Sequence, residues 1–341
     1  MNEEVMQSVI INQFNILNGD IDGLNNFIKQ HTYEHHDYYH YTSAENAEKI
    51  LESGELWLSD ISSGFSNDKV EAAKAKANEH FAISFSHELT DNLAMWYLYS
   101  GEDQLGVRIG LENGDFRRIF IKKNFDLYVR DADDGVQVKV VDINDWETHA
   151  NDWDIRVQDV LYRQDLGSAV SGKVLFYYEE VQNADFSISD WTDFEKDNRF
   201  FIKQSIWKNE LETKVIISPN SYETKKIFKE GHHYQLVVKP SYNDGKCLKD
   251  FVHVCPGPET GNDIQNLFTK MSDRVGISEY SQCINMRRKQ RMSAHSDIKD
   301  KRIDSGLDID VASDGITVRI HGNATPETIK AVFMHLKEIK D

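Results

Sequence analysis

The sequence has no long apolar run, few cysteines and too few basic residues to balance its acidic ones. Its 341 residues include three cysteines, Cys247, Cys255 and Cys283, an odd number without a C-x-x-C pair. This disfavours a disulfide framework or a zinc ribbon and favours reduced thiols in the cytoplasm. No stretch approaches the roughly 18 consecutive apolar residues of a membrane span, and the first residues do not resemble an export signal. We therefore expect a cytoplasmic protein with no membrane association.

The charge balance restricts the class of binding partner. The chain carries 57 acidic and 39 basic side chains, which gives a formal net charge of −18. An acidic surface opposes loose binding to the phosphates of nucleic acids, so any such contact would have to be local. The 40% of hydrophobic residues is sufficient for one large core or two smaller ones.

Composition and periodicity divide the chain into three parts. Residues 1–35 are predicted to form a helical appendage, and residues 36–290 a main α+β domain. Seven basic and only two acidic residues between 287 and 302 indicate a polar bridge. Residues 291–341 then contain this linker and a small ββα module, with hairpin strands over 307–311 and 316–320 and a helix that begins near Thr325.

The segment from Tyr38 to Ser59 gives the clearest local prediction. An aromatic strand over 38–41 precedes a helix in which Thr42 and Glu45 have the spacing of a capping box. Gly54 is expected to end this helix, and a strand follows at 56–59. This would hold His40 and Tyr41 at the end of a strand and beside a helix N-terminus, a suitable place for an anionic or nucleotide ligand.

Further elements are predicted from hydrophobic alternation and helical spacing, whereas residues 126–185 show these patterns less clearly. Strands are predicted over 81–86, 106–111, 136–141, 173–178, 211–217, 233–239 and 251–255. Helices are predicted over 69–80, 92–99, 198–206 and 263–275.

Two carboxylates, Glu210 and Glu212, are the main candidates for chemistry. At positions i and i+2 of a strand they would project from the same face. Such a pair could polarise a sugar hydroxyl and stabilise a developing positive charge. The alternative is a pair of solvated carboxylates on an outer strand.

Other motifs are weaker. His31, His35 and His36 could suggest a metal site, but without H-E-x-x-H or a cysteine partner a solvated cluster is favoured, and we predict no metal. Ser86-His87 lacks the G-x-S-x-G context of a hydrolase. The basic run that begins at Arg287 is either a solvated linker or a contact for a nucleic acid or an acidic partner.

Several short motifs occur in an order that resembles the bacterial family catalogued as domain of unknown function 2971. The resemblance covers about residues 36–290. The motifs are Tyr39-His40-Tyr41-Thr42-Ser43, Leu56-Trp57-Leu58-Ser59, Phe65-Ser66-Asn67-Asp68-Lys69-Val70-Glu71, Ile83-Ser84-Phe85-Ser86, Asp91-Asn92-x-x-Met95-Trp96-x-x-Tyr99, Gly106-Val107-x-Ile109, Lys203-x-x-x-Trp207-x-x-Glu210-x-Glu212-x-Lys214, Gly257-Pro258 and Ser281 to Arg287.

The sequence departs from the pattern of this family at two places. Lys69 stands where proline often follows Asn-Asp, and Lys214 stands where arginine often follows E-x-E. An ammonium cannot reproduce the planar fork of arginine, which puts a bidentate salt bridge at Lys214 in doubt.

The chain is also similar, more remotely, to ADP-ribosyltransferase-like enzymes of the His-Tyr-Glu type. The resemblance implies a mixed, bent and split β-sheet core that binds NAD as substrate. His40 would hold the nicotinamide end, and Glu212 or Glu210 would be the catalytic carboxylate. Tyr41, Trp96, Tyr97 and Tyr99 compete for the stacking role. Further ligand contacts are expected from Thr42, Ser59, Asn67, Asp68, Ser84 and Ser86.

Together these features predict transfer of ADP-ribose from NAD to an unknown macromolecular acceptor, in a toxin or anti-phage effector. An antitoxin or another protein is the expected type of partner. The alternative is a non-catalytic module that senses a nucleotide or binds a protein, which the acidic surface and Lys214 both favour. An RNA-processing enzyme is less compatible with the net charge.

Overall fold

The computed structural model describes most of the chain between residues 21 and 275 and a short hairpin beyond it. The described residues are 21–63, 69–73, 75–87, 93–99, 106–164, 175–176, 196–204, 207, 210–242, 246–257, 262–271, 274–275, 307–312 and 315–320. The chain divides into two compact units, Met1–Ile284 and Asn285–Asp341. The predicted helix near Thr325 and the predicted site residues Asn67 and Asp68 lie outside the described residues.

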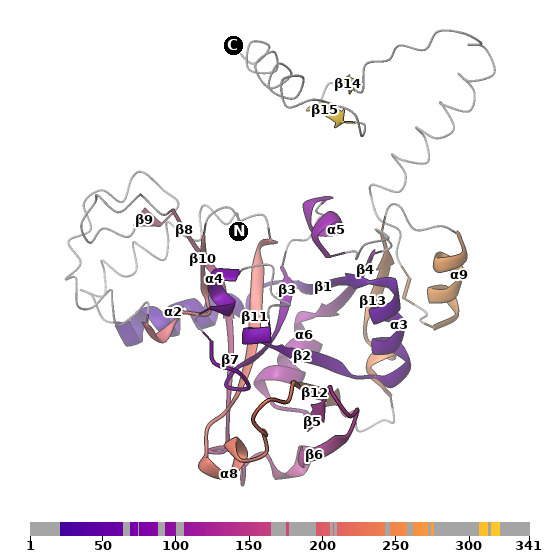
Figure 1. Ribbon diagram of the computed structural model, residues 1–341. Coiled ribbons are helices and arrows are strands. Elements are labelled where there is room, and N and C mark those ends of the chain that lie inside the picture. Colours follow the sequence, from indigo (N-terminus) through magenta and orange to yellow (C-terminus); the bar gives the residue numbers. More distant parts are fainter. Residues whose placement is uncertain are drawn as a thin grey trace. The chain divides into compact units, whose positions relative to one another are not determined.

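The first unit is a mixed α+β structure around a ten-stranded sheet whose described pairings are all antiparallel (Figure 1). Its main path runs β13-β4-β1-β3-β2-β12-β5-β6, and β11 and β7 branch from β3. The strands are β1 (Asp37–Ser43), β2 (Leu56–Asp60), β3 (Phe81–Ser86), β4 (Gly106–Glu112), β5 (Phe125–Asp131), β6 (Gln137–Val141), β7 (Trp153–Asp159), β11 (Glu212–Pro219), β12 (Tyr234–Pro240) and β13 (His253–Pro256).

The remaining described strands form two smaller sheets. In the first unit, β10 (Ile202–Gln204) pairs in parallel with β8 (Leu161–Gln164), which pairs antiparallel with β9 (Leu175–Phe176). In the second unit, β14 (Leu307–Ala312) and β15 (Gly315–Ile320) form the predicted hairpin.

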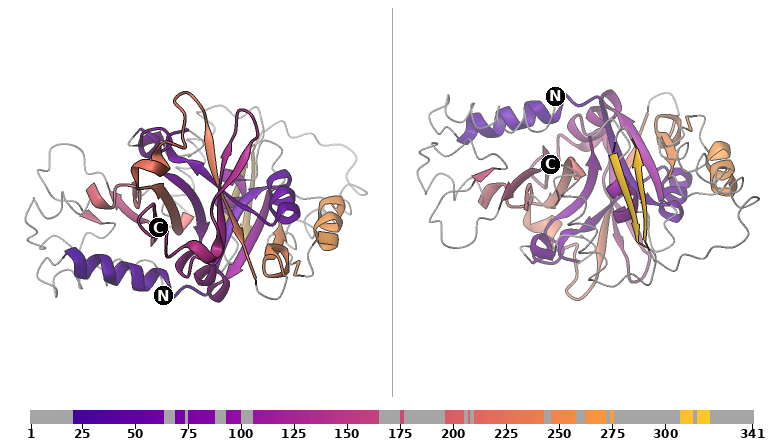
Figure 2. Two further views of the ribbon diagram at one scale, coloured as in Figure 1. Left: turned by 90° about the horizontal axis from the view of Figure 1, so that it is seen from below. Right: turned by 90° about the horizontal axis from the view of Figure 1, so that it is seen from above.

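The helices are short. They are α2 (Ile21–Thr32), α3 (Ala44–Ser53), α4 (Lys69–Ala72), α5 (Leu93–Tyr99), α6 (Asn113–Phe116), α8 (Tyr222–Lys225) and α9 (Asn262–Met271), with single turns η1 (Ile61–Ser63), η2 (Arg117–Ile121), η3 (Ile143–Asp145) and η6 (Leu248–Asp250). Helices α3 and α9 lie side by side at one end of the sheet (Figures 1 and 2). None of the helices in the described ranges combines the length and the apolar character needed to cross a lipid bilayer.

The sheet divides at β3, and this division positions the site. One edge of β3 pairs with β11 over its whole length, from Phe81 to Ser86. On the other edge, β2 pairs only with the first two residues of β3, and β1 pairs only at Ser86. Strands β1 and β2 therefore diverge from opposite ends of β3. The middle of β3 is left without a strand partner on that edge, and His40 fills this position.

The start of helix α3 differs from the prediction by one residue. Ser43, and not Thr42, is the N-cap: its Oγ accepts a hydrogen bond from the backbone N–H of Asn46. Thr42 still belongs to β1 and is buried. Gly54 ends the helix as predicted, with φ of +69° and its N–H donating to the carbonyl of Ile50.

Other predictions were wrong in the middle of the chain. The helix predicted over 198–206 is replaced at its end by strand β10, and the helix over 69–80 is reduced to α4. Strands β5, β7 and β8 were not predicted. The remaining predicted strands and the helices over 92–99 and 263–275 are confirmed in type where the structure describes their residues.

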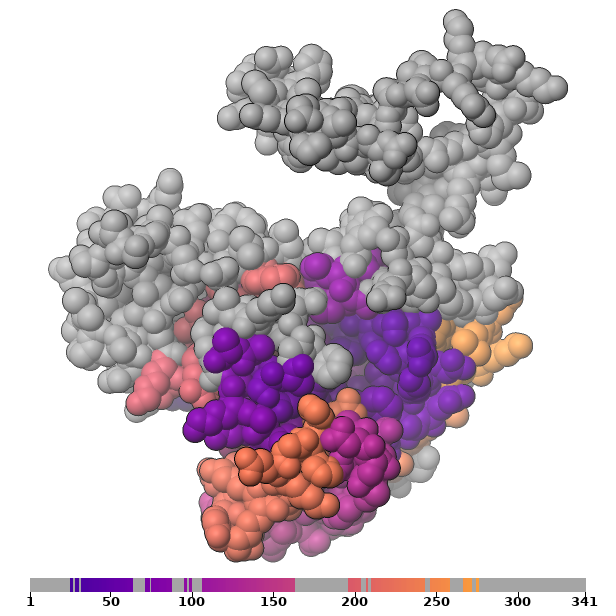
Figure 3. Space-filling view, viewed as in Figure 1, coloured from indigo at the N-terminus to yellow at the C-terminus, as the bar shows by residue number. Residues whose placement is uncertain are grey.

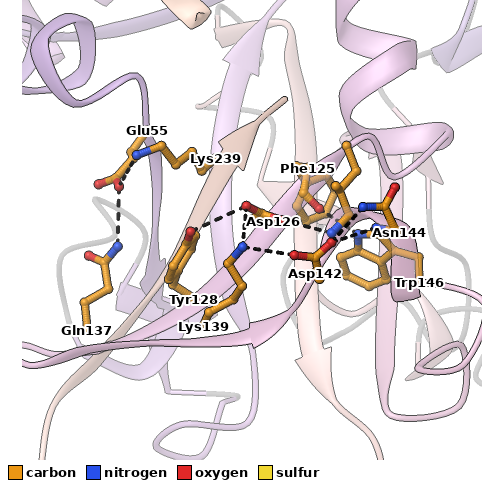
Figure 4. Close-up of polar contacts among 11 residues, drawn as sticks. Glu55, Phe125, Asp126, Tyr128, Gln137, Lys139, Asp142, Asn144, Trp146 and Lys239 are labelled. Atoms are coloured by element: carbon orange, nitrogen blue, oxygen red, sulfur yellow. Dashed lines mark hydrogen bonds and ion pairs between the residues drawn. The ribbon is translucent and has the colours of Figure 1, made fainter. Parts of the chain in front are cut away.

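Polar contacts attach the outer strands β5 and β6 to each other and to their neighbours (Figure 4). Lys139 on β6 lies 2.8 Å from a carboxylate oxygen of Asp126 on β5 and 3.1 Å from one of Asp142. The indole N–H of Trp146 donates to the carbonyl of Phe125 at 2.7 Å. Because the lysine side chain is 40% exposed, its ion pairs contribute little stability, and the buried tryptophan is the stronger attachment.

Candidate functional site

A cavity opens where β1 diverges from β3. Its volume is about 50 Å³, well below the roughly 300–1,000 Å³ of small-molecule pockets, so a bound ligand would have to displace lining side chains or extend out of the cavity. Its described lining combines aromatic, hydroxyl and carboxylate side chains: Tyr39, His40, Tyr41, Ser84, Phe85, Ser86, Met95, Tyr99, Glu210 and Glu212. Residues from the early and the late part of the first unit thus contribute to one cavity.

His40 bridges the gap between the diverging strands. Its Nδ1 lies 2.9 Å from the carbonyl oxygen of Ser84 on β3. A carbonyl can only accept, so Nδ1 must carry the proton, and Nε2 of the neutral ring is left as an acceptor. Burial lowers the pKa of His40, although the hydrogen bond to Ser84 opposes this change. The imidazole is therefore neutral at physiological pH and can accept a hydrogen bond from a ligand.

Glu212, the first residue of β11, is held as an anion in the interior. Its side chain is only 2% exposed, its Oε1 accepts a hydrogen bond from the hydroxyl of Ser84, and its backbone N–H donates to the hydroxyl of Tyr162 at 3.0 Å. Burial raises the pKa of Glu212, but the ammonium groups of Lys203 and Lys214 outweigh burial and lower it to about 2.

Glu210 lies before β11 and not within it. Leu211 separates the two carboxylates with a φ of +42°, so the regular alternation of a strand does not apply between them. Both carboxylates nevertheless line the cavity, and both are buried, so the interpretation as solvated side chains was wrong. The hydroxyl of Tyr99 donates to one oxygen of Glu210. Burial raises the pKa of Glu210, Lys203 opposes this rise, and the charge of Glu212 adds to it.

Two buried lysines connect the carboxylates. The Nζ of Lys203 lies 2.9 Å from Oε2 of Glu210 and 2.5 Å from Oε2 of Glu212. Lys214 forms an ion pair with Glu71 and lies 3.5 Å from Oε1 of Glu212. The lysine that replaces the expected arginine therefore keeps an ion pair. Three carboxylates and two ammonium groups leave one net negative charge when every member is ionised.

The structure does not bring every predicted ligand contact to the cavity. His40, Tyr41, Ser84, Ser86, Tyr99, Glu210 and Glu212 line it. Among the described residues, Thr42, Ser59 and Trp96 are outside this lining. Trp96 is instead buried behind it, where its ring meets that of Tyr41 edge-on at 4.8 Å.

Sequence reasoning gave no role to Lys203 or Tyr162, which both contact Glu212. Lys203 was visible as part of a motif, seven residues before Glu210. The contacts of both residues with Glu212 could not be predicted, because Lys203 lies in a segment predicted to be a helix and Tyr162 lies in a segment without a clear hydrophobic pattern.

Two of the histidines considered as metal ligands are exposed to solvent or have other partners. His36 is exposed, whereas Nε2 of His35 lies 2.6 Å from Asp159, and the ring of His35 stacks on that of His87 at 3.8 Å with an interplanar angle of 3°. A metal ion binds an imidazole nitrogen in the plane of the ring at roughly 2 Å. Two parallel rings at this spacing share no plane, so one ion could bind both only if a ring rotated. A hydrogen bond from Thr213 to Asp159 further occupies the carboxylate.

A wider open groove lies elsewhere on the first unit. It is bounded by residues 60–63 and 77–79 on one side and 225–233 on the other, segments that adjoin on the surface in Figure 3. Its charged side chains are of both signs, and no residue predicted for the site lines it. The cavity with His40 and Glu212 is therefore the better candidate for chemistry.

Comparisons with models of known protein families, with curated proteins and with solved structures found no match to this chain. The assignment of a function therefore depends on the geometry of the cavity and on the order of the sequence motifs.

Proposed function

We propose that this protein cleaves NAD and transfers ADP-ribose to a macromolecular acceptor. The observation that carries the proposal is that His40 and Glu212, which are 172 positions apart, line the same cavity. A hydrogen-bond acceptor and a buried anion are thereby available to one ligand. This is the pair that the resemblance to His-Tyr-Glu enzymes implies.

The division of the sheet supports an ADP-ribosyltransferase-like fold. Strand β3 pairs fully with β11 on one edge and only at its ends with β1 and β2 on the other. This is a split sheet, and the motifs that contain His40 and Glu212 lie on either side of the split. We also propose, from the order of the sequence motifs, that the chain is related to the family catalogued as domain of unknown function 2971.

The chemistry of the lining favours the cationic nicotinamide end of NAD. Among the described lining residues there is no lysine or arginine, whereas two are glutamates and three are tyrosines. Tyrosine rings attract a cation placed over their faces, and the guanidinium of Arg108 already lies 4.3 Å from the centre of the Tyr39 ring.

The proposed reaction follows from these charges. The bond between the ribose carbon and the nicotinamide nitrogen breaks, and its electron pair leaves with nicotinamide. The ribose then gains oxocarbenium character, and Glu212 stabilises it as a preorganised anion. The acceptor attacks this carbon and loses a proton, for which Glu210 is the available base because burial raises its pKa.

The resemblance extends the proposal to biological role. We propose a cytoplasmic toxin or anti-phage effector whose acceptor is a macromolecule and whose activity an antitoxin or similar protein would restrain. These parts depend on sequence resemblance alone and are separable from NAD cleavage.

The variant Glu212→Gln tests the reaction. It keeps the size of the side chain and removes its charge, so we expect nicotinamide release from NAD to fall by at least a hundredfold, as on removal of other charge-stabilising groups. Release is measured by chromatography, and a thermal melt confirms folding. Glu55→Gln, a partly exposed glutamate outside the cavity, is the control and should release nicotinamide as the unmodified protein does.

Two results would change the assignment. Unaltered release in Glu212→Gln would remove this residue from the reaction. Binding of NAD by the unmodified protein without any release of nicotinamide would favour the non-catalytic nucleotide-sensing alternative.

A further inference from the structure

The small sheet of the first unit brings two side chains to Glu212. Lys203 on β10 and Tyr162 on β8 are direct partners in the parallel register of these strands. Lys203 forms an ion pair with the Glu212 carboxylate, and Tyr162 accepts a hydrogen bond from the Glu212 backbone. The carbonyl of Glu212 in turn accepts from the backbone N–H of Val160 at 2.8 Å. This sheet thus contacts the candidate site at Glu212 and, through Lys203, at Glu210.

The two glutamates have unequal surroundings. Glu212 has two ammonium groups within 4 Å and the hydroxyl of Ser84, whereas Glu210 has one ammonium group and the hydroxyl of Tyr99. Lys203 is the only described lysine or arginine that forms ion pairs with both carboxylates. Its approach is closer to Glu212, at 2.5 Å, than to Glu210, at 2.9 Å.

We infer that Lys203 is a positioning residue that keeps Glu212 as the anion of the site, while Lys214 adds a second ammonium group to Glu212 and so distinguishes it from Glu210, the carboxyl group that exchanges a proton. Lys203 does so from the small sheet, without lining the cavity itself. The roles of Glu212 and Glu210 in catalysis rest on the proposed NAD cleavage. The difference between their surroundings does not depend on that proposal. The lowered pKa of Glu212 and the raised pKa of Glu210 agree with the geometry.

The test is a pH titration of the full chain that carries carbon-13 in its glutamate carboxyl groups. The signal of Glu212 is identified by its loss in Glu212→Gln. An opposite charge at this distance typically shifts a carboxyl pKa by about 1–3 units. In Lys203→Met we therefore expect the proton affinity of Glu212 to rise at least tenfold, and in Lys203→Arg we expect it to return toward the original value.

Lys214→Met is the matched control, because Lys214 is similarly buried but lies 3.5 Å from Glu212 and pairs chiefly with Glu71. It should raise the proton affinity of Glu212 less than Lys203→Met does. The inference is overturned if Lys203→Met leaves the Glu212 titration unchanged or if Lys214→Met changes it as much. Should Lys203→Met not fold, the double variant Lys203→Met/Glu210→Gln keeps the net charge of the site and allows the same titration.

Nicotinamide release provides the second readout. In Lys203→Met the acid limb of the pH profile should move to higher pH, and Lys203→Arg should restore it. Absence of release from the unmodified protein at any pH would reject NAD cleavage, while the titration would still decide the role of Lys203. A profile that falls in height without moving, together with an unchanged Glu212 titration, would show a purely structural role and overturn the inference.

Discussion

Buried ionisable side chains in this protein are neutral or charged according to the partners each one has. Glu212 stays ionised because two lysines offset the cost of its burial, whereas His40 is neutral because burial lowers its pKa and the hydrogen bond to the Ser84 carbonyl only partly opposes this. Lys214 shows the same principle. As an ammonium it cannot form the bidentate contact of arginine, yet it binds Glu71 and donates to the carbonyl of Phe200 at 3.2 Å.

His87 makes the stability of the folded protein depend on pH. Burial, aided by the neighbouring His35, lowers the pKa of His87 to about 4, although Asp159 opposes the change. The unfolded chain, with a pKa near 6.5, therefore binds this proton at a higher pH than the folded protein does. The stabilisation is complete above about pH 6.5 and is lost as the pH falls toward 4.

We expect His87→Gln to remove this part of the acid sensitivity. The free energy of unfolding is measured by urea titration at pH 7 and at pH 4. Between these pH values it should fall in both proteins, and the fall should be larger in the unmodified protein by on the order of 3 kcal/mol. His36→Gln is the control: Asp37 raises the pKa of this exposed histidine, so its loss should not reduce the fall in stability between pH 7 and pH 4. Equal pH dependence in His87→Gln and the unmodified protein would contradict the account.

At the scale of elements, helix α3 follows from local sequence. Ala47, Ile50 and Leu51 form its buried face, Ser43 begins it and Gly54 ends it. Gly54 adopts a left-handed φ that favours glycine. Gly114 in α6 has no positive φ, and a methyl group added there would meet no other atom within 4 Å. The two glycines therefore respond differently to alanine.

Gly54→Ala should lower the free energy of unfolding by about 1 kcal/mol, because alanine is strained in this conformation. Gly114→Ala is the control and should leave stability unchanged or raise it by up to about 1 kcal/mol, as alanine favours a helix. Both are measured by chemical denaturation. Equal effects of the two substitutions would show that the left-handed turn does not determine the end of α3.

The elements that could be predicted are those whose local pattern decides their structure. Strands β3 and β11 have clear apolar alternation or β-branched runs. Strand β7 does not, because its polar residues are satisfied by distant partners: Asp159 by His35 and Thr213, and Arg156 by the carbonyl of Asp197 at 2.6 Å. Strand β10 has only three residues and exists through its pairing with β8. Such non-local contacts leave no periodic signal.

The same reason explains what could be predicted of the site. His40, Glu210 and Glu212 stood out as chemical groups, and the order of motifs suggested that they meet. Their burial was not foreseeable for Glu210 and Glu212, because it depends on Lys203 from β10 and Lys214 from β11. Carboxylates are usually solvated unless they are paired. Lys214 follows the pair directly in sequence, but Lys203, which pairs with both carboxylates, comes from a segment that was predicted to be a helix.

At the scale of the whole molecule, the proposed function requires distant parts of the first unit to act on one ligand. Strand β1 supplies His40, β3 supplies Ser84, helix α5 supplies Tyr99, and the start of β11 supplies Glu212. The net charge of −18 reinforces a preference of the cavity for a cationic ring over a phosphate. The phosphates of NAD are therefore expected to extend out of the cavity.

The most direct test is a crystal structure of Glu212→Gln with NAD, since this variant should bind NAD without cleaving it. The account predicts the nicotinamide ring in the cavity beside His40 and Tyr99, with the glycosidic carbon facing residue 212. NAD bound in the groove between residues 60–63 and 225–233, or no bound NAD at millimolar concentration, would contradict it.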